Sequence, residues 1–98
     1  MGLRHIVTLT FRDDTTDDQI HEIVEALRRL PSQIDEIRSY DVGTDAELAE
    51  GNAHLGIVAD FDSVERYEVY RDHPAHQAVI TELIVPVIAG RSAVQHHI

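Results

Sequence analysis

Hydrophobic and polar residues alternate in several stretches of the chain, which is the pattern of β-strands with one buried face. The first such stretch, residues 3–12, places His5 and four hydrophobic residues at its odd positions, from Leu3 to Phe11. We expect this odd-numbered row to face a core, since successive strand residues point to opposite sides of a sheet. Further strands are predicted over residues 37–44, 54–62 and 92–98.

A different spacing, close to one helical turn, follows the first predicted strand. Hydrophobic residues recur on one helical face at Ile20, Ile23, Val24, Leu27 and Leu30. Thr16 and Gln19 fit a capping box at the start of this helix, and Pro31 is expected to end it.

A second, interrupted helical region lies between the third and the last predicted strand. Tyr67 and Tyr70 stand one helical turn apart, which predicts a short helix to about residue 71. Pro74 breaks it and is well suited to the first position of a new helix. Pro86 ends or kinks that helix, and Gly90 is expected to mark the turn into the last strand.

The order strand, helix, strand, strand, broken helix, strand is typical of one architecture. It predicts an α+β, ferredoxin-like βαββαβ fold, in which the helices cover one face of a four-stranded antiparallel sheet. The opposite face would be half apolar. Burying it against a second copy removes apolar area from water at about 25 cal/mol per Å², so we expect a symmetric homodimer through this sheet face. The residues on that face are Ile6, Thr8, Thr10, Gly56 and Val58.

Composition narrows the class of protein further. With 98 residues, of which 43% are hydrophobic, we expect a single domain over residues 1–98. A formal net charge of −10 disfavours binding to nucleic acid and to anionic membrane surfaces. The absence of cysteine excludes disulfides and thiolate metal sites. No secretory signal and no membrane-spanning run are visible, so a cytoplasmic protein is expected.

Residues 67–76 gather several side chains that can move protons near neutral pH. Tyr67 and Tyr70 share a helical face, while His73 and His76 flank the proline break. Purely structural roles are open for all four: the tyrosines as amphipathic helix residues, and the histidines as partners of free backbone groups. A metal site at the two histidines lacks a third ligand, so neither a metal nor a cofactor is expected.

Three segments carry a resemblance that covers essentially the whole chain. Residues 5–11 (HIVTLTF), 58–63 (VADFDS) and 70–76 (YRDHPAH), together with Gly43, resemble the stress-responsive A/B barrel domain family, also called Dabb. The resemblance implies a ferredoxin-like protomer that dimerises through its sheets into an α/β barrel. Many members of this family have no assigned reaction.

The resemblance also implies a candidate site. In one plant member, a polyketide cyclase that needs no cofactor, the catalytic tyrosine and histidine match Tyr70 and His76, and a pocket histidine matches His5. We expect His76 to act as the base, Tyr70 to donate a hydrogen bond to a carbonyl oxygen and His5 to orient the substrate or His76. Residues expected to contact a substrate are Val7, Leu9, Tyr67, His73 and Val79.

Two functions from different classes therefore remain open. The first is a cofactor-independent cyclase, lyase or isomerase that acts on a small apolar carbonyl or polyketide-like compound between sheet and helices. The second is a non-catalytic homodimeric module, stress-responsive or binding a small ligand. An enclosed cavity lined by His5, Tyr70 and His76 favours the first, and a filled interior favours the second.

Overall fold

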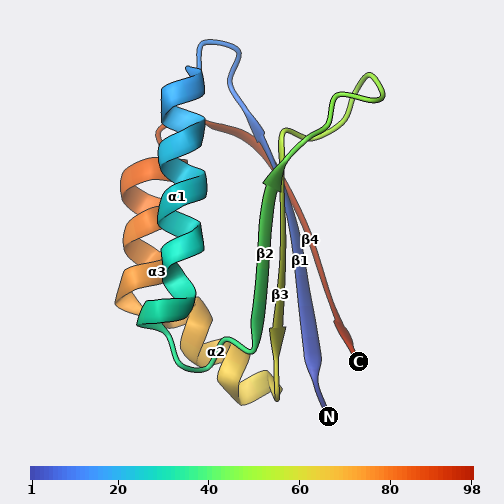
Figure 1. The fold of residues 1–98 in the computed structure, drawn as a ribbon, viewed down its shortest axis with the longest axis vertical. Helices are drawn as coiled ribbons and strands as arrows, with labels where there is room; N and C mark the ends of the chain where they lie inside the picture. The colour runs from blue at the N-terminus through green and yellow to red at the C-terminus, as the bar shows by residue number, and fades with distance from the viewer.

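The computed structural model describes residues 1–98 and has the predicted ferredoxin-like fold. Its four strands form one antiparallel sheet in the order β2-β3-β1-β4, and the helices lie together on one side of it (Figure 1). The elements in chain order are β1 (Leu3–Phe11), α1 (Asp17–Gln33), β2 (Ser39–Thr44), β3 (Leu55–Phe61), α2 (Val64–Asp72), α3 (Pro74–Val79), the π-helical turn η1 (Ile80–Ile84) and β4 (Ile88–His97).

The alternation in β1 decides which face of the sheet is covered. Every odd-numbered residue from Leu3 to Phe11 is buried under the helices, as predicted, and every even-numbered residue is partly exposed on the other face. On that open face Ile6 lies between Val58 of β3 and Val94 of β4. The sheet therefore has one face inside the hydrophobic core and one face without a cover, as expected for this fold.

Helix α1 begins as the sequence predicts and ends later than predicted. The Thr16 hydroxyl accepts a hydrogen bond from the Gln19 backbone N–H at 3.2 Å, which with the reciprocal bond completes the capping box. The prediction that Pro31 ends the helix was wrong, because α1 continues to Gln33. Leu30 and Ile34 are almost fully buried on either side of the proline, and this packing outweighs the lost backbone donor.

The interrupted helical region follows the prediction closely up to its last turn. Pro74 occupies the first turn of α3, directly after α2. At η1 the turn widens, and the Val85 N–H bonds to the Ile80 carbonyl at 2.8 Å. None of the helices combines the length and apolar character needed to cross a membrane.

Strand β4 is longer than predicted and forms an exposed edge. The expectation that Gly90 marks a turn before the strand was wrong, since β4 starts at Ile88 and Gly90 pairs with Thr10 of β1. The register shifts between Thr10 and Phe11, and this bulge lets the chain enter the strand earlier. From Arg91 onward every residue of β4 is exposed, because the helices do not cover this edge of the sheet.

Candidate active site

The three predicted catalytic side chains come together around the ring of Tyr70. Tyr70 is only 2% exposed, on the inner side of α2. Its ring stacks on that of His76 from α3, with centroids 4.1 Å apart and planes 28° from parallel. The His5 ring, from β1, lies edge-on to the same tyrosine at 6.3 Å. Strand β1 and the consecutive helices α2 and α3 thus place two imidazoles and a phenol in one cluster.

The hydrogen bond of His76 fixes which nitrogen carries its proton. Its Nδ1 lies 3.0 Å from the backbone carbonyl of Arg71. Because a carbonyl oxygen only accepts, Nδ1–H is the donor, and Nε2 keeps a free lone pair. Burial lowers the pKa of His76, although its backbone hydrogen bonds oppose this effect. At neutral pH the side chain is therefore an uncharged imidazole with a basic nitrogen available.

His5 is held in the other tautomer. The Gln95 Nε2 amide of β4 lies 2.8 Å from His5 Nδ1, so the amide donates and the proton of His5 sits on Nε2. Burial, with smaller effects from the charges of Arg91 and His76, lowers the pKa of His5 to about 4. Next to a neutral base, the cluster thus holds a neutral imidazole that is able to donate a proton in a hydrogen bond.

Tyr70 is part of a pair of hydroxyl groups. Its oxygen lies 2.8 Å from that of Tyr40, which projects from β2. Burial raises the pKa of Tyr70 to about 12 and also raises the pKa of Tyr40. Both groups keep their protons at neutral pH. In such a pair one O–H donates to the other, which leaves the second O–H free for a ligand oxygen.

The residues predicted to contact a substrate have different surroundings. Tyr67 joins the cluster, with its ring 5.0 Å from that of His5. His73 instead caps α3, because its Nδ1 accepts from the Ala75 backbone N–H at 3.0 Å. Its geometry matches the structural role that the sequence left open for it. The remaining three are at most 8% exposed and belong to the hydrophobic core: Val7, Leu9 and Val79.

Three members of the site were not foreseen as such. Tyr40 was placed on a strand face but not connected with Tyr70, because strand order cannot be read from one strand. Gln95 and Arg91 lie on the edge strand, on the side that faces the helices. Arg91, Ala93 and Gln95 are alternate residues of β4, and this spacing was the available signal that they share one face of the sheet. The last strand, however, was predicted to start only after Arg91.

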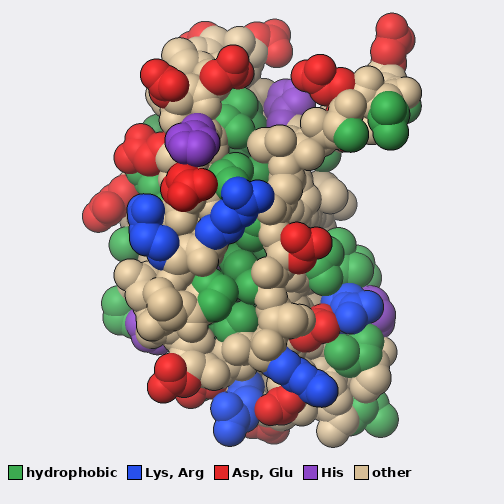
Figure 2. All heavy atoms as spheres, viewed as in Figure 1, with side chains coloured by type: hydrophobic (Ala, Val, Ile, Leu, Met, Phe, Trp, Pro, Cys, Tyr) green, Lys and Arg blue, Asp and Glu red, His purple; other side chains and the backbone are tan.

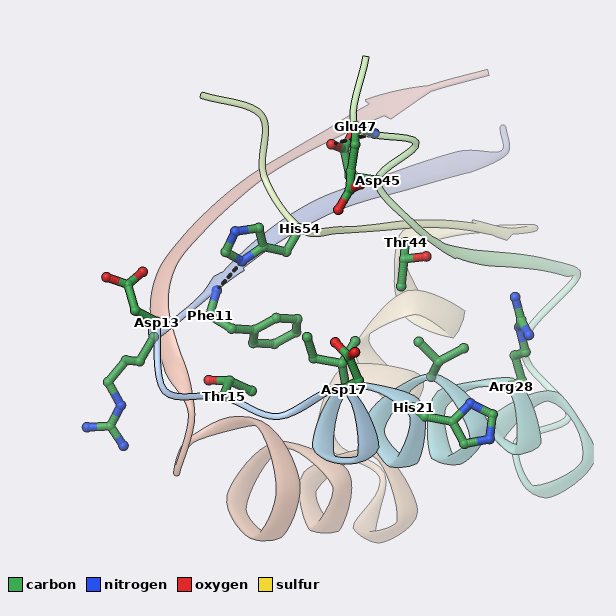
Figure 3. Close-up of a pocket in the computed structure, with 13 residues that line it drawn as sticks. Phe11, Asp13, Thr15, Asp17, His21, Arg28, Thr44, Asp45, Glu47 and His54 are labelled. Carbon is green, nitrogen blue, oxygen red and sulfur yellow. Dashed lines mark hydrogen bonds between the residues drawn. The ribbon is translucent and has the colours of Figure 1, made fainter. Parts of the chain in front are cut away.

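A large hollow lies at the opposite end of the molecule, where α1 begins. It measures about 580 Å³ and opens between that helix and the loop before β3 (Figure 3). Its walls carry Asp17 and His21 of α1, and His54, whose Nδ1 accepts from the Phe11 backbone N–H at 2.9 Å. Acidic side chains gather over this end (Figure 2). Neither this hollow nor two smaller ones include His5, Tyr70 or His76, and no group of side chains suits a metal ion.

Comparisons with known proteins agree with this fold. Residues 3–96 match the family model described as Stress Responsive A/B Barrel Domain. A stress-response A/B barrel domain-containing protein of Arabidopsis thaliana is 32% identical, over 95% of this chain and 93% of the relative. Olivetolic acid cyclase of Cannabis sativa is also 32% identical, over 78% of this chain and 77% of the relative.

A solved structure is closer still. It is described as a dimeric ferredoxin-like protein of unknown function from Thermobifida fusca, and it is 40% identical. The likeness covers all of this chain and 92% of that chain, with a TM-score of 0.92. The fold prediction is thereby confirmed, and dimeric assembly is described for a structural relative.

Proposed function

This chain belongs to the stress-responsive A/B barrel domain family, and from that premise we propose that it is a cofactor-independent enzyme acting on a small carbonyl or polyketide-like compound. The reaction is a cyclisation, cleavage or isomerisation that begins with removal of a proton next to a carbonyl. One observation carries the proposal: the neutral His76 imidazole, with Nε2 free, stacks on Tyr70 in a buried cluster. The similarity to olivetolic acid cyclase supports the same chemistry.

Each step uses a group whose protonation is set by its surroundings. His76 Nε2 takes the proton, and the electron pair of the C–H bond forms an enolate. The free O–H of the Tyr40–Tyr70 pair donates to the developing enolate oxygen, and burial strengthens that hydrogen bond. In a cyclisation the enolate carbon attacks a second carbonyl, and the alkoxide formed takes the proton from His76. In an isomerisation the carbon itself is reprotonated by His76, and either route restores the neutral base.

Access to the cluster is proposed from the side of β4. His5 and Tyr70 are nearly inaccessible, whereas His76 is half-buried. The helix-facing side of β4 is exposed, so a ligand reaches the site between this strand and α3. The buried side chains then act away from bulk water, as an enolate mechanism requires.

Exchange of α-protons with solvent deuterium tests the proposal directly. The purified protein is mixed in D₂O with 2-heptanone or ethyl acetoacetate, and loss of the α-proton signal is followed by NMR. We expect acceleration by the parent protein and a loss of about 10²–10⁴-fold in His76→Ala, the usual contribution of a general base. Tyr70→Phe should also slow exchange, and His21→Ala, in the distant hollow, should not. Equal rates in all four proteins would refute the assignment.

The pH profile of that exchange gives an independent check. Burial lowers the pKa of His76 below its ordinary value, so the rate should fall only at pH values below the usual histidine range, as the base becomes protonated. The pKa of Tyr70 is raised to about 12, so the hydrogen-bond donor stays protonated through alkaline solutions. We expect a plateau from about pH 7 to pH 10, and a maximum near pH 5 would contradict the roles assigned.

The second candidate function is a non-catalytic homodimeric module, stress-responsive or binding a small ligand. It is favoured by the open apolar row of Ile6, Val58 and Val94, the last of which is 53% exposed. The dimeric relative supports a homodimer through this sheet face, which is compatible with either function. Light scattering should give a dimer for the parent at micromolar concentration and a monomer for Val94→Asp. A monomeric parent would rule the dimer out.

A further inference from the structure

One positively charged side chain beside the buried cluster, that of Arg91, is not paired with any acidic side chain of the protein. Arg91 pairs with Leu9 across β4 and β1, and Leu9 points into the core, so Arg91 lies on the helix-facing side of the sheet. Gln95, which holds His5, is on that same side of β4. Arg91 is exposed and forms no salt bridge or side-chain hydrogen bond, whereas Arg4, for comparison, is paired with Asp60 at 2.8 Å.

The strand between the cation and the cluster carries one small side chain on its helix-facing side. Ala93 is the only helix-facing residue of β4 between Arg91 and Gln95, and it pairs with Val7 of β1. Both neighbouring strand positions thus contribute short side chains. All helix-facing residues of β4 beyond Ala93 are polar, so this wall is not suited to a long alkyl chain.

We propose that Arg91 binds a carboxylate of the substrate, which makes the substrate class small oxo acids: carbonyl compounds that carry an anionic group. The inference rests on the function proposed above and specifies its ligand. A guanidinium donates two parallel N–H bonds to a carboxylate, and its fixed plane orients the bound acid. Its carbonyl group is then directed past Ala93 toward His76 and the Tyr70 hydroxyl. An otherwise acidic chain, of net charge −10, admits such an anion only where a local cation is free.

The electrostatic effect of Arg91 on the cluster agrees with this placement. Its positive charge adds to the effect of burial in lowering the pKa of His5 and of His76, and it partly opposes the rise that burial causes in the pKa of Tyr70. A carboxylate bound at Arg91 compensates that charge. Binding of an acid should therefore raise the pKa of both histidines, and a neutral ligand at the same place should not.

The test compares an acid with its own ester. Levulinate carries a ketone and a carboxylate, and methyl levulinate keeps the ketone without the charge. Each is titrated into the parent protein while the ring signals of His5 and His76 are followed by NMR. We expect levulinate to bind about tenfold more tightly than the ester or better, as one charge-assisted bidentate contact predicts. The pKa of both histidines should rise with levulinate only.

Variants at Arg91 decide whether this residue is the cause. Arg91→Gln should reduce the preference for levulinate to within about twofold, and Arg91→Lys should keep part of it as a point charge. Arg66→Gln is the matched control, because Arg66 is an exposed arginine on α2 that also lacks an ion pair. Equal binding of acid and ester, no binding of either, or a preference that survives in Arg91→Gln would overturn the inference.

The outcome is separable from that of the proposed function. Binding is measured without turnover, so a preference for the acid with no α-proton exchange refutes the enzyme and leaves the anion site in place. Exchange on a neutral ketone that is unchanged in Arg91→Gln, with no preference for the acid, refutes the anion site and leaves the enzyme in place.

Discussion

The two ends of the layer between helices and sheet differ in their side-chain packing. One end contains open space, and the other contains ionisable side chains whose pKa values are shifted. At the end where α1 begins, a hollow of about 580 Å³ is lined mainly by polar and charged side chains (Figure 3). At the end near α2, the rings of His5, Tyr70 and His76 are packed together, and this hollow includes none of them. The hollow has space, and the cluster has groups whose proton affinity the protein has changed.

The difference teaches that volume alone does not locate a reactive site in this protein. Charges around the hollow are solvated, and water screens their effect on any ligand. In the cluster, burial alters the pKa values of two histidines and two tyrosines, and such shifts are concentrated at functional sites. Substitutions at both ends can test whether the cluster is dense and the hollow loose.

Removing an aromatic ring beneath the cluster should have the largest effect on stability. Phe61 is fully buried and lies 5.1 Å from the Tyr70 ring and 5.6 Å from the Tyr67 ring. Phe61→Ala should lower the free energy of unfolding by about 3–5 kcal/mol, measured by urea denaturation. Ile20→Ala, at the wall of the hollow, should cost less than about half of that. Equal losses would erase the contrast between dense and loose packing.

Acid should destabilise the protein through His5. The pKa of this side chain is about 4 in the folded protein and about 6.5 in the unfolded chain, so the unfolded chain binds more protons between these values. Stability should be complete above about pH 6.5 and should fall by about 3 kcal/mol from this residue as the pH decreases to 4.

Unfolding of His5→Gln at several pH values isolates that contribution. In this variant the free energy of unfolding should depend much less on pH between 6.5 and 4 than in the parent, whatever its value at neutral pH. His21→Gln, an exposed histidine at the hollow, should keep the parent slope. The same slope in parent and His5→Gln would show that burial of His5 does not drive the pH dependence.

The hydroxyl pair should contribute a smaller amount. Tyr40→Phe leaves the buried Tyr70 hydroxyl without its partner and should cost about 1–2 kcal/mol. The double variant Tyr40→Phe, Tyr70→Phe should be less destabilised than the sum of the single variants, because both polar groups are then absent. Additive losses in thermal or urea unfolding would indicate that the two hydroxyls are not coupled.

The cap of α3 should have the smallest of these effects. His73→Ala removes the acceptor for the Ala75 N–H and should cost about 1 kcal/mol, measured by urea unfolding. His73→Asn supplies another capping acceptor and should recover most of that loss. Neither change should affect α-proton exchange, since His73 is tied to the backbone. A large loss of exchange in both variants would move His73 into the site.

Local pattern was sufficient to predict the fold. The row from Leu3 to Phe11 and the Thr16 capping box are properties of neighbouring residues, and both are confirmed. The errors at Pro31 and Gly90 arose where distant packing decided the outcome. Buried neighbours extend α1 past the proline, and pairing with β1 draws Gly90 into a strand. Neither contact is visible in the local sequence.

The candidate site was predictable only in part, for a related reason. The resemblance supplied Tyr70, His76 and His5, and the structure brings these side chains together. The partners that set their protonation, Tyr40 and Gln95, come from strands whose neighbours are fixed by strand order and register. A one-residue change of register would turn Gln95 to the opposite face, so the alternation along β4 does not by itself assign Gln95 to His5.

The π-helical turn η1 has a consequence for the evolution of this chain. A wide turn of this kind holds a surplus residue within a helix, because its hydrogen bond spans five residues instead of four. Deleting the exposed Thr81 would remove the surplus residue, so that an ordinary α-helical turn could form at η1. Ile84 would then have to rotate out of the core. Single-residue insertions and deletions among homologous sequences should therefore gather at η1, and the capped start of α3 should keep its length.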